Sequence, residues 1–206
     1  LLDIGCNYGF FLKVCGPYFN TYGIDISRYA ISQAKHYARR SKLVLCDIER
    51  NIPFRDGTFD VVTMFDTLEH IKNHRNLLKE IYRVLVPGGA LTLTTPNKWS
   101  IDSILFGKDY WLVRDSSHVV LFSKESLREV LQEANFRKVR IGTISLLHFI
   151  GHFKVPPIDK EGTSCSRAIH GHASGLLRKW LGQCRSVIND LPTPWGANLY
   201  AFARKC

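Results

Sequence analysis

The chain has 206 residues, about 1.4 times a typical domain of roughly 150 residues, which favours one elaborated domain over two. Apolar residues make up 45% of the chain and charged residues 22%, proportions that exclude a disordered protein. No apolar run approaches the roughly 20 residues of a membrane-spanning helix, which excludes a transmembrane protein. The sequence begins at Leu1, inside its first predicted strand, so we expect a truncated N-terminus.

The formal net charge of +10 is unevenly distributed along the chain. Residues 134–206 hold eleven Lys and Arg against three acidic residues, a net charge of +8, which leaves +2 for residues 1–133. A basic segment of this kind suits nucleic acid, an anionic membrane surface or a phosphorylated substrate. A solvated basic face is the simpler interpretation, and charge alone favours it.

Six cysteines are spread along the sequence, at Cys6, Cys15, Cys46, Cys165, Cys184 and Cys206. No two of them form a Cys-x-x-Cys pair, and the first three lie in apolar surroundings. This pattern is typical of buried reduced thiols and not of a disulfide framework. We therefore expect a reducing, cytoplasmic setting.

Strand-like and helix-like stretches alternate along the chain. The predicted strands cover residues 1–4, 22–26, 43–46, 59–65, 90–94, 136–144 and 198–204. The predicted helices cover residues 10–15, 28–39 and 124–134, and a fourth carries Leu77, Leu78, Ile81, Val84 and Leu85 and ends at Pro87-Gly88-Gly89. Ser27 and Ser123 are the expected N-caps of the second and last helices. The second helix is expected to pack through Tyr29, Ala30, Ala34 and Tyr37.

Strands separated by helices build βαβ units, and near-continuous apolar strands such as 59–65 indicate a sheet covered on both faces. We therefore expect an α/β fold, a doubly wound and mostly parallel sheet with helices on both faces. In such sheets ligands bind beyond the carboxyl ends of the strands, at the switch point. Functional residues are thus expected directly after the strands.

A glycine-containing turn, Leu2-Asp-Ile-Gly-Cys-Asn-Tyr-Gly9, joins the first strand to the first helix. Gly5 lets the backbone approach a ligand, and the helix that follows Gly9 favours an anionic group at its N-terminus. The turn lacks the Gly-x-Gly-x-x-Gly of dinucleotide sites, which disfavours NAD. Taken alone, a tight strand-to-helix connection explains this turn equally well.

Three acidic residues, Asp3, Asp25 and Asp47, lie at the ends of the first three strands. Asp25 follows Gly9 by sixteen residues, at a position where a carboxylate accepts hydrogen bonds from ribose hydroxyls. Asp47 ends the third strand, where an adenine amino group would lie. The three carboxylates together indicate an adenosine-shaped site.

A series of motifs in a fixed order extends this pattern along the chain. Its members are Leu2-Asp-Ile-Gly-Cys-Asn-Tyr-Gly9, Tyr22-Gly-Ile-Asp-Ile26, Cys46-Asp47, Pro53-Phe-Arg-Asp-Gly-Thr-Phe-Asp-Val-Val62, Leu68-Glu-His70, Leu85-Val-Pro-Gly-Gly89 and His118-Val-Val-Leu-Phe-Ser123. With them, residues 1–144 and the final strand resemble the class I S-adenosylmethionine-dependent methyltransferases. The small-molecule branch, methyltransferase type 11 with the quinone-biosynthesis O-methyltransferases, is the most similar. The resemblance implies a Rossmann-like, seven-stranded, mostly parallel sheet whose last strand is antiparallel.

The resemblance implies S-adenosylmethionine as the cofactor and assigns residues to its methionine half. The methionine part is expected along the turn that contains Gly5, Cys6 and Gly9. Asp3 is expected to bond toward the ammonium group. The backbone at Phe65 is expected to complete the site near the amino end of the methionine.

The same resemblance assigns the adenosine half of the cofactor. Asp25 is expected to hold the ribose hydroxyls and Asp47 the adenine amino group, while Ile26 and Ile48 flank the adenine ring. One residue departs from the family pattern, because Asn7 replaces the glycine usual in the middle of the first motif. Asparagine tolerates a left-handed backbone, so we expect the turn to be retained.

Methyl transfer to a hydroxyl group requires alignment of the acceptor, exclusion of water and removal of a proton. Histidine has a suitable pKa for the base, and the candidates are His118 and His70. His118 has the stronger case because its segment follows the fifth strand, where the family places substrate contacts. An anchoring role in the loop is an equally good explanation for His118, and His70 is also explained by ordering of its own turn. Glu69 is a candidate assistant or a helix-start carboxylate.

Residues 145–195 have no counterpart in the core motifs and are expected to form an acceptor-side insertion or lid, before a closing strand in residues 196–206. His148 and His152 are spaced as on one helix face, but no Cys-x-x-Cys or His-Glu-x-x-His pattern accompanies them, so no metal site is predicted. Residues 176–188 carry an apolar stripe, typical of a buried lid helix or of a peripheral membrane contact. The lid is the favoured interpretation.

The sequence therefore predicts one methyltransferase domain that transfers a methyl group from S-adenosylmethionine to a small-molecule acceptor, at oxygen. A non-catalytic cofactor-binding partner subunit is an alternative that Asn7 leaves open. An NAD-linked oxidoreductase is a weaker alternative, because the first motif is wrong for it and no Tyr-x-x-x-Lys pair is present. Nucleic acid is disfavoured as a partner, because residues 94–97 lack the Asn/Asp-Pro-Pro-Tyr/Phe pattern of base methylation and no stacking pattern recurs.

Overall fold

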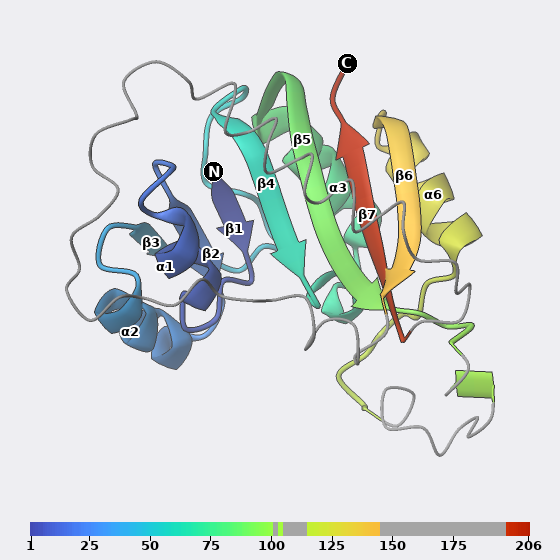
Figure 1. The fold of residues 1–206 in the computed structure, drawn as a ribbon, viewed down its shortest axis with the longest axis horizontal. Coiled ribbons are helices and arrows are strands. Elements are labelled where there is room, and N and C mark those ends of the chain that lie inside the picture. The colour runs from blue at the N-terminus through green and yellow to red at the C-terminus, as the bar shows by residue number, and fades with distance from the viewer. Residues whose placement is uncertain (101–102, 105–114, 145–196) are drawn as a thin grey trace.

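The computed structural model describes residues 1–100, 103–104, 115–144 and 197–206 (Figure 1). Its elements in chain order are β1 (Leu2–Ile4), α1 (Phe10–Cys15), β2 (Tyr22–Asp25), α2 (Arg28–Tyr37), β3 (Lys42–Leu45), β4 (Phe59–Phe65), the short 3₁₀ helix η1 (Leu68–His70), α3 (His74–Val84), β5 (Leu85–Pro96), α6 (Lys124–Glu133), β6 (Arg137–Ile144) and β7 (Asn198–Arg204). The predicted insertion at residues 145–195, with the apolar stripe of residues 176–188, lies outside the described residues.

The strands form one seven-stranded sheet in the order β3-β2-β1-β4-β5-β7-β6. β1 to β5 pair in parallel, and β7 lies between β5 and β6 and is antiparallel to both (Figure 1). The predicted fold class is thereby confirmed: an α/β, doubly wound, Rossmann-like sheet with an antiparallel last strand. The strand order reverses between β1 and β4, which places the switch point at the carboxyl ends of these two strands.

Helices cover both faces of the sheet. Consecutive residues of β4 point to opposite faces, so Val61 and Val62 belong to two different buried clusters. Val61 packs with Leu12 of α1 and Ile31 of α2. Val62 belongs to the larger cluster, which includes buried side chains of α3 and α6, the two helices behind the sheet in Figure 1.

The predicted packing face of α2 is partly wrong. Ser27 caps the helix as expected, since its Oγ accepts a hydrogen bond from the Ala30 N–H at 3.1 Å. The buried side chains are Ala30, Ile31 and Ala34, which recur at the helical period. Tyr29 is 65% exposed and Tyr37 is 43% exposed, because both lie beside that stripe and not on it.

The Pro87-Gly88-Gly89 sequence does not end a helix, contrary to the prediction. α3 ends at Val84, and Leu85 already has an extended backbone and begins β5. β5 then continues through the sequence with a shift of register, since Phe59 pairs with Leu85 while Val61 pairs with Ala90. Gly88, with φ 78°, allows this irregularity within the strand.

The predicted start of the strand at residues 90–94 is also wrong, because β5 begins five residues earlier, at Leu85. The other predicted bounds agree within two residues. The Ser123 N-cap is confirmed as a capping box, in which the Ser123 and Ser126 side chains each accept the other residue's backbone N–H. Among the described residues, the cysteines form no disulfide bond; they are Cys6, Cys15, Cys46 and Cys206. No helix within the described ranges is both long and apolar enough to cross a membrane.

Candidate functional site

The glycine turn after β1 lies at the switch point in a left-handed conformation. Gly5, Asn7 and Gly9 have φ values of 71°, 48° and 75°. Asn7 therefore keeps the turn despite replacing the usual glycine, as predicted. A Cβ added at Gly5 would collide with the side chain of Thr67, so the turn packs directly against the loop that follows β4.

Asp25 connects this turn to the start of α2. Its Oδ2 accepts a hydrogen bond from the Asn7 N–H at 2.9 Å, and its Oδ1 accepts one from the Ser27 N–H at 2.8 Å. Each carboxylate oxygen has two lone pairs, so each retains acceptor capacity. The side chain is half-buried at the carboxyl end of β2, where it can accept two ligand hydroxyl donors.

Asp47 and two isoleucines surround the carboxyl ends of β2 and β3. The Oδ1 of Asp47 accepts the Glu49 N–H at 3.1 Å, and its Oδ2 lies 3.3 Å from the Arg50 Nε. Ile48 is half-buried and packs against the main core cluster. Ile26 is 68% exposed, so this edge of the sheet presents an apolar side chain beside two carboxylates. The combination fits a flat aromatic base with a polar sugar.

Asp3 lies beneath the turn, within β1, and is only 3% exposed. Its Oδ1 accepts a hydrogen bond from the Thr63 hydroxyl at 2.7 Å. Burial raises the pKa of Asp3 to about 7, against the opposite effect of the Thr63 hydrogen bond. A cation placed beside this carboxyl group would favour its ionised form.

Phe65 ends β4 on the other side of the switch point. Its ring is 4.9 Å from the ring of Phe11, centroid to centroid, in an edge-to-face arrangement. Its carbonyl oxygen accepts a hydrogen bond from the Thr67 hydroxyl at 2.9 Å. The Phe65 backbone is therefore fixed against the same threonine that packs on Gly5.

The two candidate bases, His70 and His118, lie together. Their ring centroids are 4.9 Å apart. The Nδ1 of His70 is 3.0 Å from the carbonyl oxygen of Ser117, and because a carbonyl only accepts, Nδ1 carries the proton. In the neutral ring this leaves Nε2 as the proton acceptor. The Nε2 of His118 lies 3.8 Å from the Oδ2 of Asp115.

Glu69 holds the loop that carries His118 against the sheet. Its backbone carbonyl accepts hydrogen bonds from the N–H groups of Val119 and Val120, at 2.8 and 3.2 Å. Its side chain is almost completely buried, and its Oε2 accepts a hydrogen bond from the Thr95 hydroxyl at 2.9 Å. Burial raises the pKa of the Glu69 carboxyl group above its usual range.

The described residues include one cluster of three metal-ligating side chains, formed by Glu69, His70 and His118. Their ligand atoms lie within 4.8 Å of one another. Two imidazoles and a carboxylate are ligands that a divalent transition metal accepts. The sequence predicts no metal site, and that remains a prediction.

Sequence reasoning missed the threonines that organise the site. Thr63 and Thr95 bind the buried carboxyl groups of Asp3 and Glu69, and Thr67 joins the glycine turn to η1. One signal for Thr63 was present, because it is a hydroxyl residue inside the apolar strand at residues 59–65. A buried hydroxyl requires a hydrogen-bond partner, which points to an acid on the neighbouring strand.

Comparisons with known proteins agree with this architecture. Residues 1–141 match the family model described as a methyltransferase domain. An uncharacterised protein of Methanocaldococcus jannaschii is 36% identical over 165 residues, 78% of this chain and 70% of that protein. The mitochondrial ubiquinone biosynthesis O-methyltransferase of Rattus norvegicus is 29% identical over 113 residues, which cover 51% of this chain and only 33% of the rat enzyme.

A solved structure shows the same fold. The phosphoethanolamine N-methyltransferase 2 of Haemonchus contortus, in complex with S-adenosyl-L-methionine, superposes with a TM-score of 0.66 at 21% identity. The match covers 99% of this chain and 48% of that protein. The chain therefore belongs to the methyltransferase-domain family, as an S-adenosylmethionine-dependent methyltransferase of the class I fold.

Proposed function

We propose that the adenosine half of S-adenosylmethionine binds across the carboxyl ends of β2 and β3. Asp25 accepts the ribose hydroxyls, because backbone N–H groups hold both of its oxygens in place and leave each a lone pair. Asp47 accepts a hydrogen bond from the adenine amino group. Ile26 and Ile48 pack on the ring, and the large exposed area of Ile26 supports this role.

The methionine half lies along the turn of Gly5, Cys6 and Gly9. The ammonium group of the methionine is directed toward Asp3 and favours the ionised form of its carboxyl group. The backbone at Phe65 lies next to the same amino end of the methionine. The buried setting of Asp3 supports this assignment, because a carboxyl group with a pKa of about 7 gains most from a neighbouring cation.

The acceptor is a small molecule that is methylated at a hydroxyl oxygen. One observation carries this proposal: the His70 and His118 rings pack together, and the backbone N–H of His70 donates a hydrogen bond at 3.1 Å to the carbonyl of Thr67, whose side chain packs against Gly5. The bound cofactor supplies an electrophilic methyl group on a sulfonium. The Nε2 of His70 accepts the proton of the acceptor hydroxyl, while the Ser117 carbonyl fixes its ring and the His118 ring packs beside it.

Methylation at oxygen also has support from a relative. The rat protein that matches 51% of this chain is named as an ubiquinone biosynthesis O-methyltransferase. The match covers only a third of that enzyme. The proposal of a hydroxyl acceptor therefore rests on the geometry of the two histidines and not on the name of the relative. A small acceptor hydroxyl needs an aligned base, which the pair provides.

We further propose that residues 1–206 form one methyltransferase domain in a cytoplasmic protein. Residues 1–144 are the cofactor-binding core, residues 145–195 are an acceptor-side insertion or lid, and residues 196–206 contain the closing strand. A peripheral membrane contact through residues 176–188 belongs to the same proposal. Co-sedimentation with anionic liposomes tests it, and absence of salt-sensitive binding would remove the membrane contact.

Calorimetry and turnover test the function in two steps. The chain is titrated with S-adenosylmethionine and with NAD, and only the first is expected to bind. Formation of S-adenosylhomocysteine is then measured with a panel of phenols and catechols at saturating cofactor. His70→Gln is expected to lower kcat by at least about 100-fold, whereas His36→Gln, on the exposed surface of α2, leaves kcat unchanged. Cofactor binding without turnover on any panel member would instead indicate a non-catalytic partner subunit.

A further inference from the structure

The sheet ends at β3, and some backbone N–H and C=O groups of this strand point away from the sheet. The N–H of Lys42 donates to Thr21 and that of Cys46 donates to Asp25, so these residues face β2. Backbone groups alternate in direction along a strand, which turns the N–H and C=O groups of Leu43 and Leu45 away from β2. Within the described ranges no strand pairs with this outer side. A strand edge in this state is a template for a further strand.

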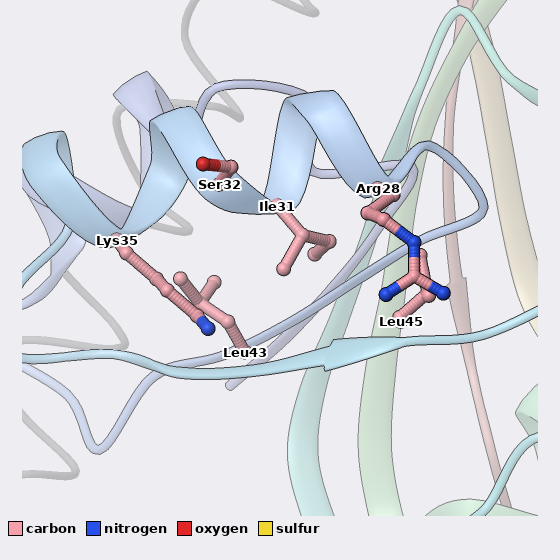
Figure 2. Close-up of a pocket in the computed structure, with 6 residues that line it drawn as sticks. All are labelled: Arg28, Ile31, Ser32, Lys35, Leu43 and Leu45. Atoms are coloured by element: carbon pink, nitrogen blue, oxygen red, sulfur yellow. The ribbon is translucent and has the colours of Figure 1, made fainter.

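A shallow pocket of about 230 Å³ lies along this edge, between α2 and β3. Figure 2 shows Leu43 on the strand below Ile31 of the helix, with Leu45 at the Arg28 end of the pocket. Arg28 and Lys35 extend from the helix at the two ends of the pocket (Figure 2). Leu45 is 42% exposed, so the pocket has an apolar floor that is open to a ligand.

The helix and strand that form this edge, α2 and β3, are strongly basic, with Asp25 and Asp47 lying only at the carboxyl ends of β2 and β3. Residues 26–46 contain five basic residues and no Asp or Glu; the five are Arg28, Lys35, Arg39, Arg40 and Lys42. Arg28, Lys35 and Arg40 are exposed, whereas the Nε of Arg39 donates to the His36 carbonyl at 3.3 Å and the Lys42 ammonium donates to the Tyr22 hydroxyl at 3.1 Å. A second copy of this chain docked edge to edge would bring like charges together, which disfavours self-association. An acidic partner is favoured by the same charges.

We propose that the β3 edge, with the pocket beside it, docks an extended acidic segment of a partner protein, which adds a strand to the sheet. The partner's backbone pairs with the outward groups of Leu43 and Leu45, and an apolar side chain enters the pocket. Acidic side chains on either side of it pair with Arg28 and Lys35. Because only a polypeptide offers the backbone pattern that a strand edge requires, a partner protein is favoured over nucleic acid and over an anionic membrane.

The spacing of the two basic residues matches such a strand. Arg28 and Lys35 are seven residues apart on α2, and a rise of 1.5 Å per residue places them about 10 Å apart along the helix. Two acidic residues four positions apart on an extended strand are about 13 Å apart, with an apolar residue midway on the same face. Flexible Arg and Lys side chains cover the difference of about 3 Å.

A fluorescein-labelled peptide of sequence TETVTET places Glu, Val and Glu on one face and serves as the probe. Its binding to the full chain is measured by fluorescence anisotropy up to millimolar concentration. We expect saturable binding that weakens with added salt. The peptide TKTVTKT, in which Lys replaces Glu, is expected not to bind. Of two peptides N-methylated at alternate residues, one is expected to lose binding, because only one set of amides faces β3.

Variants locate the site. Arg28→Glu with Lys35→Glu is expected to weaken TETVTET binding at least tenfold, whereas Lys79→Glu, an exposed charge reversal on α3, leaves it unchanged. Leu45→Pro removes one outward N–H without touching the bonds to β2 and is expected to weaken binding at least fivefold. Hydrogen exchange of the Leu43 and Leu45 amides is expected to slow when the peptide is bound.

Several outcomes would overturn this proposal. One is the absence of TETVTET binding at millimolar concentration, and another is equal binding of the Lys peptide. Unchanged affinity in the Arg28 and Lys35 double variant would show that the peptide binds elsewhere. A dimer in sedimentation velocity that Leu45→Pro abolishes would assign the edge to a second copy of this chain and refute the acidic partner.

Discussion

The buried carboxyl group of Asp3 gives a prediction that connects stability with the proposed cofactor site. Burial raises its pKa from 3.8 to about 7 in the folded chain, so folding favours the protonated form. The stabilising effect of this bound proton is fully present below about pH 4 and is lost as the pH rises to about 7. A shift of about three pKa units at 1.36 kcal/mol each corresponds to roughly 4 kcal/mol.

Asp3→Asn removes this ionisation and keeps an oxygen that accepts the Thr63 hydrogen bond. The free energy of unfolding is measured by urea titration between pH 4.5 and pH 8, without cofactor. Relative to the wild type, we expect the variant to gain stability steadily as the pH rises, by roughly 3 kcal/mol across this range, because about a quarter of the full effect is already lost at pH 4.5. Gln132→Ala, an exposed and non-ionisable position on α6, is the control and is expected to give a flat difference. A difference for Asp3→Asn that stays constant with pH would refute the reasoning.

Three further predictions concern the scaffold, and each is measured by urea denaturation. Gly57→Ala is expected to lower the free energy of unfolding by about 1 kcal/mol, because Gly57 has φ 60° but open space around its Cβ position. Gly5→Ala is expected to lower it further, because the added Cβ also collides with Thr67. Equal losses would show that the contact with Thr67 is unimportant. Ser123→Ala removes the cap of α6 and is expected to cost about 1 kcal/mol, and no loss would contradict the capping box. Arg83→Met removes the donor to two backbone carbonyls and two carboxylates and is expected to lower the free energy of unfolding by about 2 kcal/mol. An unchanged free energy of unfolding would show that these hydrogen bonds make no net contribution to stability.

Much of the fold follows from local patterns in the sequence. The apolar run at residues 59–65 and the cap at Ser27 locate β4 and the start of α2, because each depends on contacts within a few residues. Pro87-Gly88-Gly89 was misinterpreted because its role depends on pairing with Phe59 and Val61, far away in sequence. Local rules assign Pro and Gly to helix ends, whereas the register of the sheet decides here.

The geometry of the candidate site was predictable at the strand ends and unpredictable where side chains meet across loops. The sequence placed Asp25 at the carboxyl end of a strand, and the structure has it as the last residue of β2. The contact between His70 and His118, 48 positions apart, required the loop that Glu69 binds through its backbone, and no periodicity encodes it. The burial of Glu69 was likewise invisible, since its partner Thr95 lies on a different strand.

Transfer of a labelled methyl group tests the central claim most directly. S-adenosylmethionine with a trideuterated methyl group is incubated with the chain and with the phenol or catechol that gives the highest turnover, and the product is analysed by mass spectrometry and NMR. We predict label on the acceptor oxygen, dependent on His70 and on Asp25. Label on carbon or nitrogen, or label on oxygen that persists undiminished in His70→Gln, would contradict the account.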